Sequence, residues 1–208
     1  MPADKSLSFY GPVYHRLLDP PLAEARRVAA GFIPRGSSVL DIACGTGAFC
    51  VLLKKEKACR VVGVDLSMKM IEFARRSSPY PDIPFLHEDA TDLSAFADFS
   101  FDHCTILMLM HELTRAERAA VLKEALRIAR SAVIVDSVAP LPRNAGGLGI
   151  RLVEATFGRD HNPNFKAFLA AGGIASIFED YGQPVSVVHR IEFFRGCREA
   201  VVVTAISP

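Results

Sequence analysis

The chain lacks the long charged and apolar runs that mark several classes of protein. Its 208 residues carry a net charge of +1, and no long basic run or stripe appears, so general attraction to nucleic acid is not expected. No apolar run approaches the length of a membrane span, and the N-terminus lacks the charged and then apolar pattern of a secretion signal. These absences predict a cytoplasmic protein with no nucleic-acid partner and no stable insertion into a membrane.

Metal-binding and disulfide patterns are also missing. None of the five cysteines forms a CxxC pair, and all but Cys59 lie in apolar or glycine-turn surroundings. Because such positions usually belong to a packed interior, we expect reduced thiols rather than disulfides or a metal site. Half of the residues are apolar, which at this length allows a single domain with a sizeable core.

What the sequence does contain, from residue 37 onward, is an alternation of apolar strands and helices. Strands are predicted at 38–42, 60–65, 83–87, 101–110 and 132–136. Helices are predicted near 47–57, after a Ser67 cap, and from the capping box Thr114–Glu117 to about 130. This alternation predicts right-handed βαβ units and a parallel sheet.

Both ends of the chain depart from that alternation. Residues 1–35 have helical spacing that Pro12, Pro20 and Pro21 interrupt, and residues 139–149 are rich in proline and glycine and predict a loop. Further helices are predicted at 150–158, 164–171 and 174–181. The alternating segments 184–194 and 198–206 predict a β-hairpin, so that one strand joins the sheet antiparallel.

The first strand leads into the segment VLDIACGTGAF, residues 39–49, in which a glycine turn opens a helix. Gly45 and Gly47 allow a tight backbone that approaches a ligand closely. Acids stand at the ends of the first three strands, as Asp41, Asp65 and Asp89. Acids at neighbouring strand ends suit hydroxyl, ammonium and amino groups better than a polyphosphate. A dinucleotide fingerprint would also need a third glycine where this chain has Cys50.

Together these segments resemble the class I S-adenosylmethionine (SAM)-dependent methyltransferases. The matching segments are VLDIACGTG, VVGVD with LSMKMIEFAR behind it, HEDATDL, and FDHCTILMLMHEL. The resemblance implies an α/β, doubly wound, mostly parallel seven-stranded sheet with an antiparallel last strand and N-terminal cap helices. One domain would then span 1–208, with a helical cap (1–35), a cofactor-binding core (36–136), a substrate-side segment (137–183) and a C-terminal hairpin (184–208).

The resemblance also implies SAM as cofactor, with S-adenosylhomocysteine as product, and assigns residues to it. Asp41, Gly45 and Gly47 would cradle the methionine part, Asp65 would hold the ribose hydroxyls, and Met68 would cover the adenine. The full predicted set is Asp41, Ala43, Cys44, Gly45, Gly47, Asp65, Leu66, Met68, Asp89, Ala90, Thr105 and Leu107. Ala43 stands where many such enzymes carry glycine, and the methyltransferases of quinone biosynthesis resemble this chain there.

The acceptor is less defined. His111 is the candidate base, because histidine can take a proton near neutral pH; it could instead be a satisfied histidine at a helix start, and Asp136 is expected to be structural. The predicted substrate residues are Tyr10, Tyr14, His111, Arg143 and His161. The apolar residues around them favour a small, partly apolar acceptor that is methylated on O, N or C.

The sequence allows more than one partner and more than one function. The N-terminal tyrosine pattern resembles methyltransferases of quinones and of phospholipid amines, so transient contact with a membrane surface is one expectation. The oligomeric state is expected to be a monomer or a homodimer. The alternative functions are a nicotinamide-nucleotide oxidoreductase and a catalytically silent SAM-binding regulatory protein.

Overall fold

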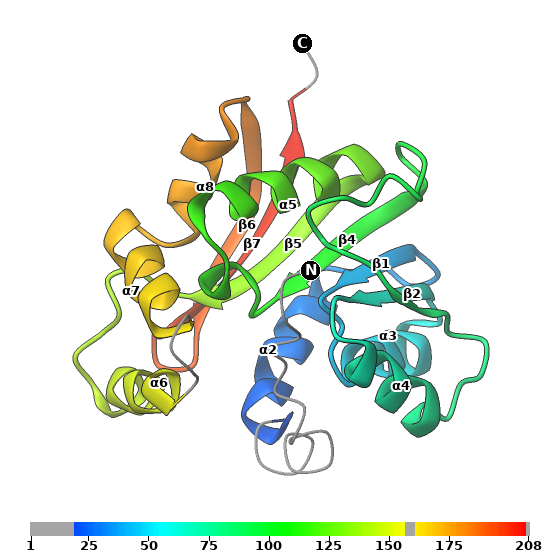
Figure 1. Ribbon diagram of the computed structural model, residues 1–208, viewed down its shortest axis with the longest axis horizontal. Helices are drawn as coiled ribbons and strands as arrows, with labels where there is room; N and C mark the ends of the chain where they lie inside the picture. Colours follow the sequence, from blue (N-terminus) through cyan, green and yellow to red (C-terminus); the bar gives the residue numbers. More distant parts are fainter. Residues whose placement is uncertain (1–18, 157–160, 207–208) are drawn as a thin grey trace.

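The computed structural model describes residues 19–156 and 161–206, in which seven strands form one sheet (Figure 1). The strands lie in the order β3-β2-β1-β4-β5-β7-β6, and all are parallel except β7, which is antiparallel to both of its neighbours. They are β1 (Ser38–Ile42), β2 (Arg60–Asp65), β3 (Phe85–His87), β4 (Phe101–Leu107), β5 (Ala129–Ser137), β6 (Val185–Phe193) and β7 (Arg198–Ala205). The predicted mostly parallel seven-stranded sheet and its antiparallel last strand are confirmed.

Helices cover both faces of the sheet, as its buried apolar residues require. The described helices are α2 (Asp19–Gly31), α3 (Ala48–Lys57), α4 (Met68–Ser77), the short 3-10 helix η1 (Met110–Glu112), α5 (Arg115–Ile128), α6 (Ala145–Thr156), α7 (His161–Ala171) and α8 (Ile174–Tyr181). Two of the predicted helix caps are present. Ser67 accepts a hydrogen bond from the Met70 N–H, and Thr114 and Glu117 form the reciprocal capping box.

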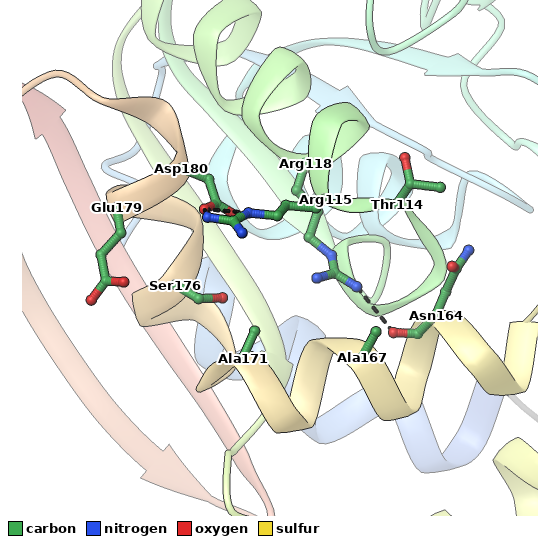
Figure 2. A pocket seen from close by; sticks show the side chains of 9 residues that line it. All are labelled: Thr114, Arg115, Arg118, Asn164, Ala167, Ala171, Ser176, Glu179 and Asp180. Atoms are coloured by element: carbon green, nitrogen blue, oxygen red, sulfur yellow. Dashed lines mark hydrogen bonds and ion pairs between the residues drawn. The ribbon is translucent and has the colours of Figure 1, made fainter.

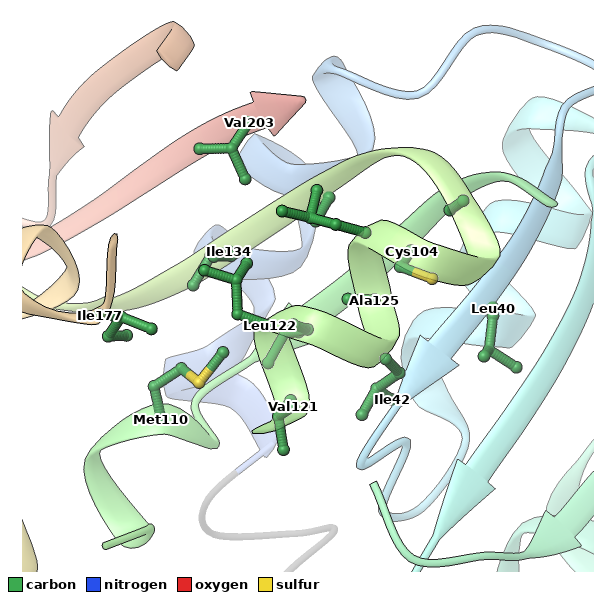
Figure 3. Close-up of a cluster of buried hydrophobic side chains, with 14 of the residues drawn as sticks. Leu40, Ile42, Cys104, Met110, Val121, Leu122, Ala125, Ile134, Ile177 and Val203 are labelled. Atoms are coloured by element: carbon green, nitrogen blue, oxygen red, sulfur yellow. The ribbon is translucent and has the colours of Figure 1, made fainter. Parts of the chain in front are cut away.

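Alternate residues of the strands point to opposite faces of the sheet and pack into two separate hydrophobic cores. On one face, α5 and α8 pack against residues such as Leu40, Ile42 and Ile134 (Figure 3). On the other face, α2, α3 and α4 pack against residues such as Val39, Val61 and Val133. A third and smaller cluster, Leu141, Ile150, Phe165 and Cys197, holds α6 beside α7.

The prediction of a loop over 139–149 is wrong at its C-terminal end, because α6 begins at Ala145. The Asn144 side chain accepts a hydrogen bond from the Gly147 N–H (2.9 Å) and donates one to the Arg195 carbonyl (3.1 Å) in the hairpin turn. A helix start rich in glycine is thus fixed by a residue far along the chain. Pro20 and Pro21 lie in the first turn of α2, where a missing N–H costs no helical hydrogen bond.

The described residues hold neither a membrane-spanning helix nor a metal-binding group. No described helix is long and apolar enough to cross a membrane. Within the same residues, no three His, Cys, Asp or Glu side chains come together as metal ligands could. All five cysteines are free and buried.

Candidate cofactor and acceptor site

The glycine turn between β1 and α3 follows a left-handed path. Ala43, Gly45 and Gly47 all have positive φ angles, of 58°, 53° and 75°. A Cβ on Gly47 would lie 2.7 Å from the Phe85 ring, whereas a Cβ on Gly45 would meet no atom within 4 Å. Gly47 is therefore required for packing, and Gly45 leaves open space above the turn.

Asp65, at the end of β2, fixes this turn. Its two carboxylate oxygens accept hydrogen bonds from the N–H groups of Gly45 and Ser67, each at 2.8 Å. Burial raises the pKa of Asp65, and the two backbone donors oppose that shift. Next to it, the side chains of Leu66 and Met68 are 65% and 44% exposed. A carboxylate flanked by exposed apolar side chains can bind a group with hydroxyls on one side and a flat apolar ring on the other.

Asp41 lies beneath the turn rather than on its surface. The strand register places it beside Thr105 of β4, whose hydroxyl donates a hydrogen bond to its carboxylate at 2.7 Å. The Cys50 thiol donates a second, at 3.3 Å. The side chain is 2% exposed, and burial raises its pKa to about 6. The neighbouring Cys44 thiol is also buried.

The other predicted cofactor residues lie along the same edge of the sheet. Asp89 follows β3 and is exposed, and its carboxylate accepts hydrogen bonds from the N–H and hydroxyl of Thr91 at 2.8 and 2.7 Å. Ala90 and Leu107 are half-buried, and Thr105 is fully buried. The structure therefore brings the ends of β1, β2 and β4 together around the glycine turn, with Asp89 at the end of β3.

His111, the candidate base, is buried in η1 with 3% of its surface exposed. Its Nδ1 lies 2.8 Å from Asp136 Oδ1, its Nε2 lies 3.7 Å from Glu154 Oε2, and its backbone N–H donates to Asp136 Oδ2. Burial alone would lower its pKa, but Asp136, with Glu112 and Glu154, raises it to about 9. His111 is thus an imidazolium at neutral pH, held between carboxylates from β5 and α6.

This pairing was only partly predictable from the sequence. Asp136 was expected to be structural, and it does hold His111, but the partnership depends on the packing of η1 against the end of β5. The sequence does not predict a role for Glu154 at the site, because no other acid stands within a helical turn of it. The structure assigns it to the inner side of α6, facing His111.

A buried arginine fixes η1 from behind. Arg118 donates hydrogen bonds to the carbonyl oxygens of Met110 (2.8 Å) and Asn164 (3.0 Å), and its guanidinium lies over the Phe168 ring at 5.1 Å. It lines a pocket between α5, α7 and α8 whose volume is about 380 Å³. Figure 2 shows the side chains around this pocket. The centroid of the Phe168 ring lies 6.5 Å from that of the His111 ring. Arg118 therefore helps to position His111 through the backbone of η1 and through Phe168.

Of the predicted substrate residues other than His111, the described part of the chain includes only Arg143 and the backbone of His161. Arg143 is exposed in the segment before α6, and His161 is the first residue of α7. Tyr10 and Tyr14 lie outside the described residues, as does the side chain of His161.

The residues at the sheet edge fit SAM. The open space over Gly45 leaves room for the methionine part, the Asp65 oxygens each retain acceptor capacity for a ribose hydroxyl, and Leu66 and Met68 present apolar surface. The comparison with known families decides the matter: residues 39–132 match the family described as "Methyltransferase domain". This core is a class I SAM-dependent methyltransferase domain.

Known proteins agree with this assignment for the methyltransferase core. The chain is 34% identical over 113 residues to the O-methyltransferase cnsE of Penicillium expansum, covering 52% of this chain and 41% of that protein. It is 36% identical over 112 residues to a demethylmenaquinone methyltransferase of Clavibacter sepedonicus, covering 51% and 44%. The chain therefore spans less than half of the length of these curated relatives.

The solved structures extend the likeness to the whole fold. The PH0226 protein from Pyrococcus horikoshii OT3 has a TM-score of 0.70 at 18% identity, and the match covers 93% of this chain and 98% of that one. At this identity the likeness concerns the fold alone.

Proposed function

We propose that this methyltransferase moves a methyl group from SAM to a small, partly apolar acceptor. The observation that supports it most is the arrangement at the end of β2, where Asp65 fixes the Gly45 turn beside two exposed apolar side chains. The matched relatives include an O-methyltransferase and a demethylmenaquinone methyltransferase. An acceptor with both an apolar body and a nucleophilic oxygen, nitrogen or carbon is consistent with these comparisons.

Each part of the cofactor has a matching group in this proposal. Asp65 would accept hydrogen bonds from the ribose hydroxyls, Leu66 and Met68 would contact the faces of the adenine, and Asp89 with Ala90 would meet its edge. The turn at Gly45 and Gly47 would hold the methionine part, with the Asp41 carboxylate beneath it as the counter-charge for the ammonium group. Thr105 and Leu107 lie between this region and the acceptor side.

When bound, SAM supplies a methyl group on a sulfonium that is ready for in-line attack. The protein must then hold the acceptor atom in line and exclude water. His111 is proposed to accept the proton of an acidic acceptor, which requires its neutral imidazole. Because Asp136 and Glu154 favour the charged form, we expect the transfer rate to rise with pH toward about 9.

Cofactor binding is tested by calorimetry with S-adenosylhomocysteine on Asp65→Ala. The matched control is Asp102→Ala, because Asp102 also accepts two hydrogen bonds, from the Ser38 N–H (2.8 Å) and hydroxyl (2.7 Å), but at the opposite end of the sheet. We expect Asp65→Ala to lose most of the affinity and Asp102→Ala to retain it. Unchanged affinity in Asp65→Ala would remove the ribose assignment.

The acceptor role of His111 is tested separately with His111→Gln. We expect slower transfer, a flattened pH profile and nearly unchanged affinity for S-adenosylhomocysteine. Loss of that affinity, or a pH profile that matches the wild type, would make His111 a structural residue.

A further inference from the structure

The helix α6 buries its one acid and exposes two of its leucines, unlike an ordinary surface helix. Its inner face carries Gly147, Ile150 and Glu154, all buried. Its opposite face carries Leu148 and Leu152, one helical turn apart, which are 59% and 62% exposed. A surface helix of a globular protein normally turns its apolar side inward. In α6 a carboxylate faces the interior, and leucines face outward.

The exposed charges of the described stretch that contains α6 have one sign. Among the described residues from 137 to 171 the only acid is Glu154, and it is buried. The basic residues Arg143, Arg151 and Lys166 of the same stretch are all exposed. An exposed apolar helix face with exposed cations near it in the chain fits a helix that lies at the surface of an anionic membrane.

The position of α6 adds a reason for such contact. Glu154, on its inner side, lies 3.7 Å from the His111 ring, at the edge of the sheet that also carries the glycine turn. Figure 1 shows α6 at the lower left of the molecule, below α7. A surface that binds the outer face of α6 would therefore lie next to the acceptor side of the site.

We propose that α6 docks onto an anionic lipid surface. Leu148 and Leu152 enter the boundary between headgroups and acyl chains, while Arg143, Arg151 and Lys166 face the phosphates. The contact needs no covalent anchor and no spanning helix, and it is expected to be reversible. It also stands apart from the methyl-transfer proposal, because vesicle binding is measured without SAM.

The chain contains no tryptophan, so one introduced indole reports on its own surroundings. Leu152→Trp is mixed with vesicles of phosphatidylglycerol or of phosphatidylcholine, and the fluorescence maximum is recorded. The matched control is Val188→Trp, since Val188 is also an exposed apolar residue, on strand β6. We expect a blue shift only for Leu152→Trp, only with phosphatidylglycerol, and weaker at high salt.

Vesicle sedimentation separates the apolar contribution from the charges. The double variant Leu148→Ser/Leu152→Ser should lose most of the binding, whereas Val187→Ser/Ile191→Ser on β6 should retain it. Arg143→Gln and Arg151→Gln should each weaken binding to phosphatidylglycerol about fivefold. These residues are exposed, so the substitutions should leave folding intact.

Three results would overturn the proposal. The first is no blue shift of Leu152→Trp with either vesicle. The second is an equal shift of Val188→Trp, which would indicate general adsorption. The third is a shift that depends on protein concentration without lipid, which would show that a second copy of the chain covers α6.

Discussion

The buried imidazolium of His111 predicts a stability that depends on pH. Its pKa is about 9 in the folded chain and close to 6.5 when exposed. The folded state thus holds the proton more tightly than the unfolded state. The resulting stabilisation is fully present below pH 6.5 and is lost as the pH rises through 9. Integrated over this interval, a shift of this size corresponds to about 3 kcal/mol of the free energy of unfolding.

The assay is urea unfolding of the wild type and of His111→Gln at several pH values from 6 to 10. Titrating groups far from His111 contribute equally to both proteins, so the difference between the two curves reports on His111 and the carboxylates paired with it. We expect that difference to shrink by about 3 kcal/mol between pH 6.5 and 10. Asp136→Asn should remove most of this pH dependence, because Asp136 is the partner of the ring at 2.8 Å.

A constant difference between the wild type and His111→Gln across this range would refute the reasoning. It would mean that His111 is neutral in the folded chain and serves as a hydrogen-bonding core residue. The pH dependence concerns only the preference for the proton. It does not say that the ion pair is more stable than a well-packed apolar replacement.

Two further perturbations test the cofactor side. Burial raises the Asp41 pKa to about 6, so the ionised carboxylate destabilises the folded, cofactor-free protein. Asp41→Asn should therefore stabilise that protein in urea unfolding by up to about 3 kcal/mol at pH 8 and hardly at all near pH 4. The same variant should bind SAM more weakly, and an unchanged or lower stability at pH 8 would contradict the burial argument. Gly47→Ala should cost about 3 kcal/mol, since its Cβ would lie 2.7 Å from Phe85 at a φ of 75°. Gly36→Ala, at a φ of 78° with no neighbour within 4 Å, should cost only about 1–2 kcal/mol, and equal losses in the two thermal melts would show that the contact with Phe85 is unimportant.

Much of the fold could be predicted from local patterns. The strand Ser38–Ile42 and the helix Ile174–Tyr181 have the predicted bounds, because each has a clear apolar period and a clear boundary. The start of α6 could not be predicted in this way. Its glycines disfavour a helix locally, and the residue that fixes Asn144 lies in the hairpin turn at Arg195.

The site likewise has one part that the sequence predicts and one part that it does not. The glycine turn and Asp65 are close in sequence to the strands that position them, and their geometry follows from the βαβ unit. The surroundings of His111 depend on three elements, η1, β5 and α6, which meet only in the folded chain. Periodicity cannot reveal that a histidine lies between two carboxylates, nor that its pKa rises instead of falling.

The small cluster that holds α6 separates this helix from the two large hydrophobic cores. Neither of the two large cores contains a residue of α6, whose described apolar anchor is Ile150 in the cluster with Leu141, Phe165 and Cys197. Substitutions on its outer face therefore leave the sheet and the glycine turn unchanged. The outer face of α6 can therefore be exchanged for another binding surface while the fold is kept.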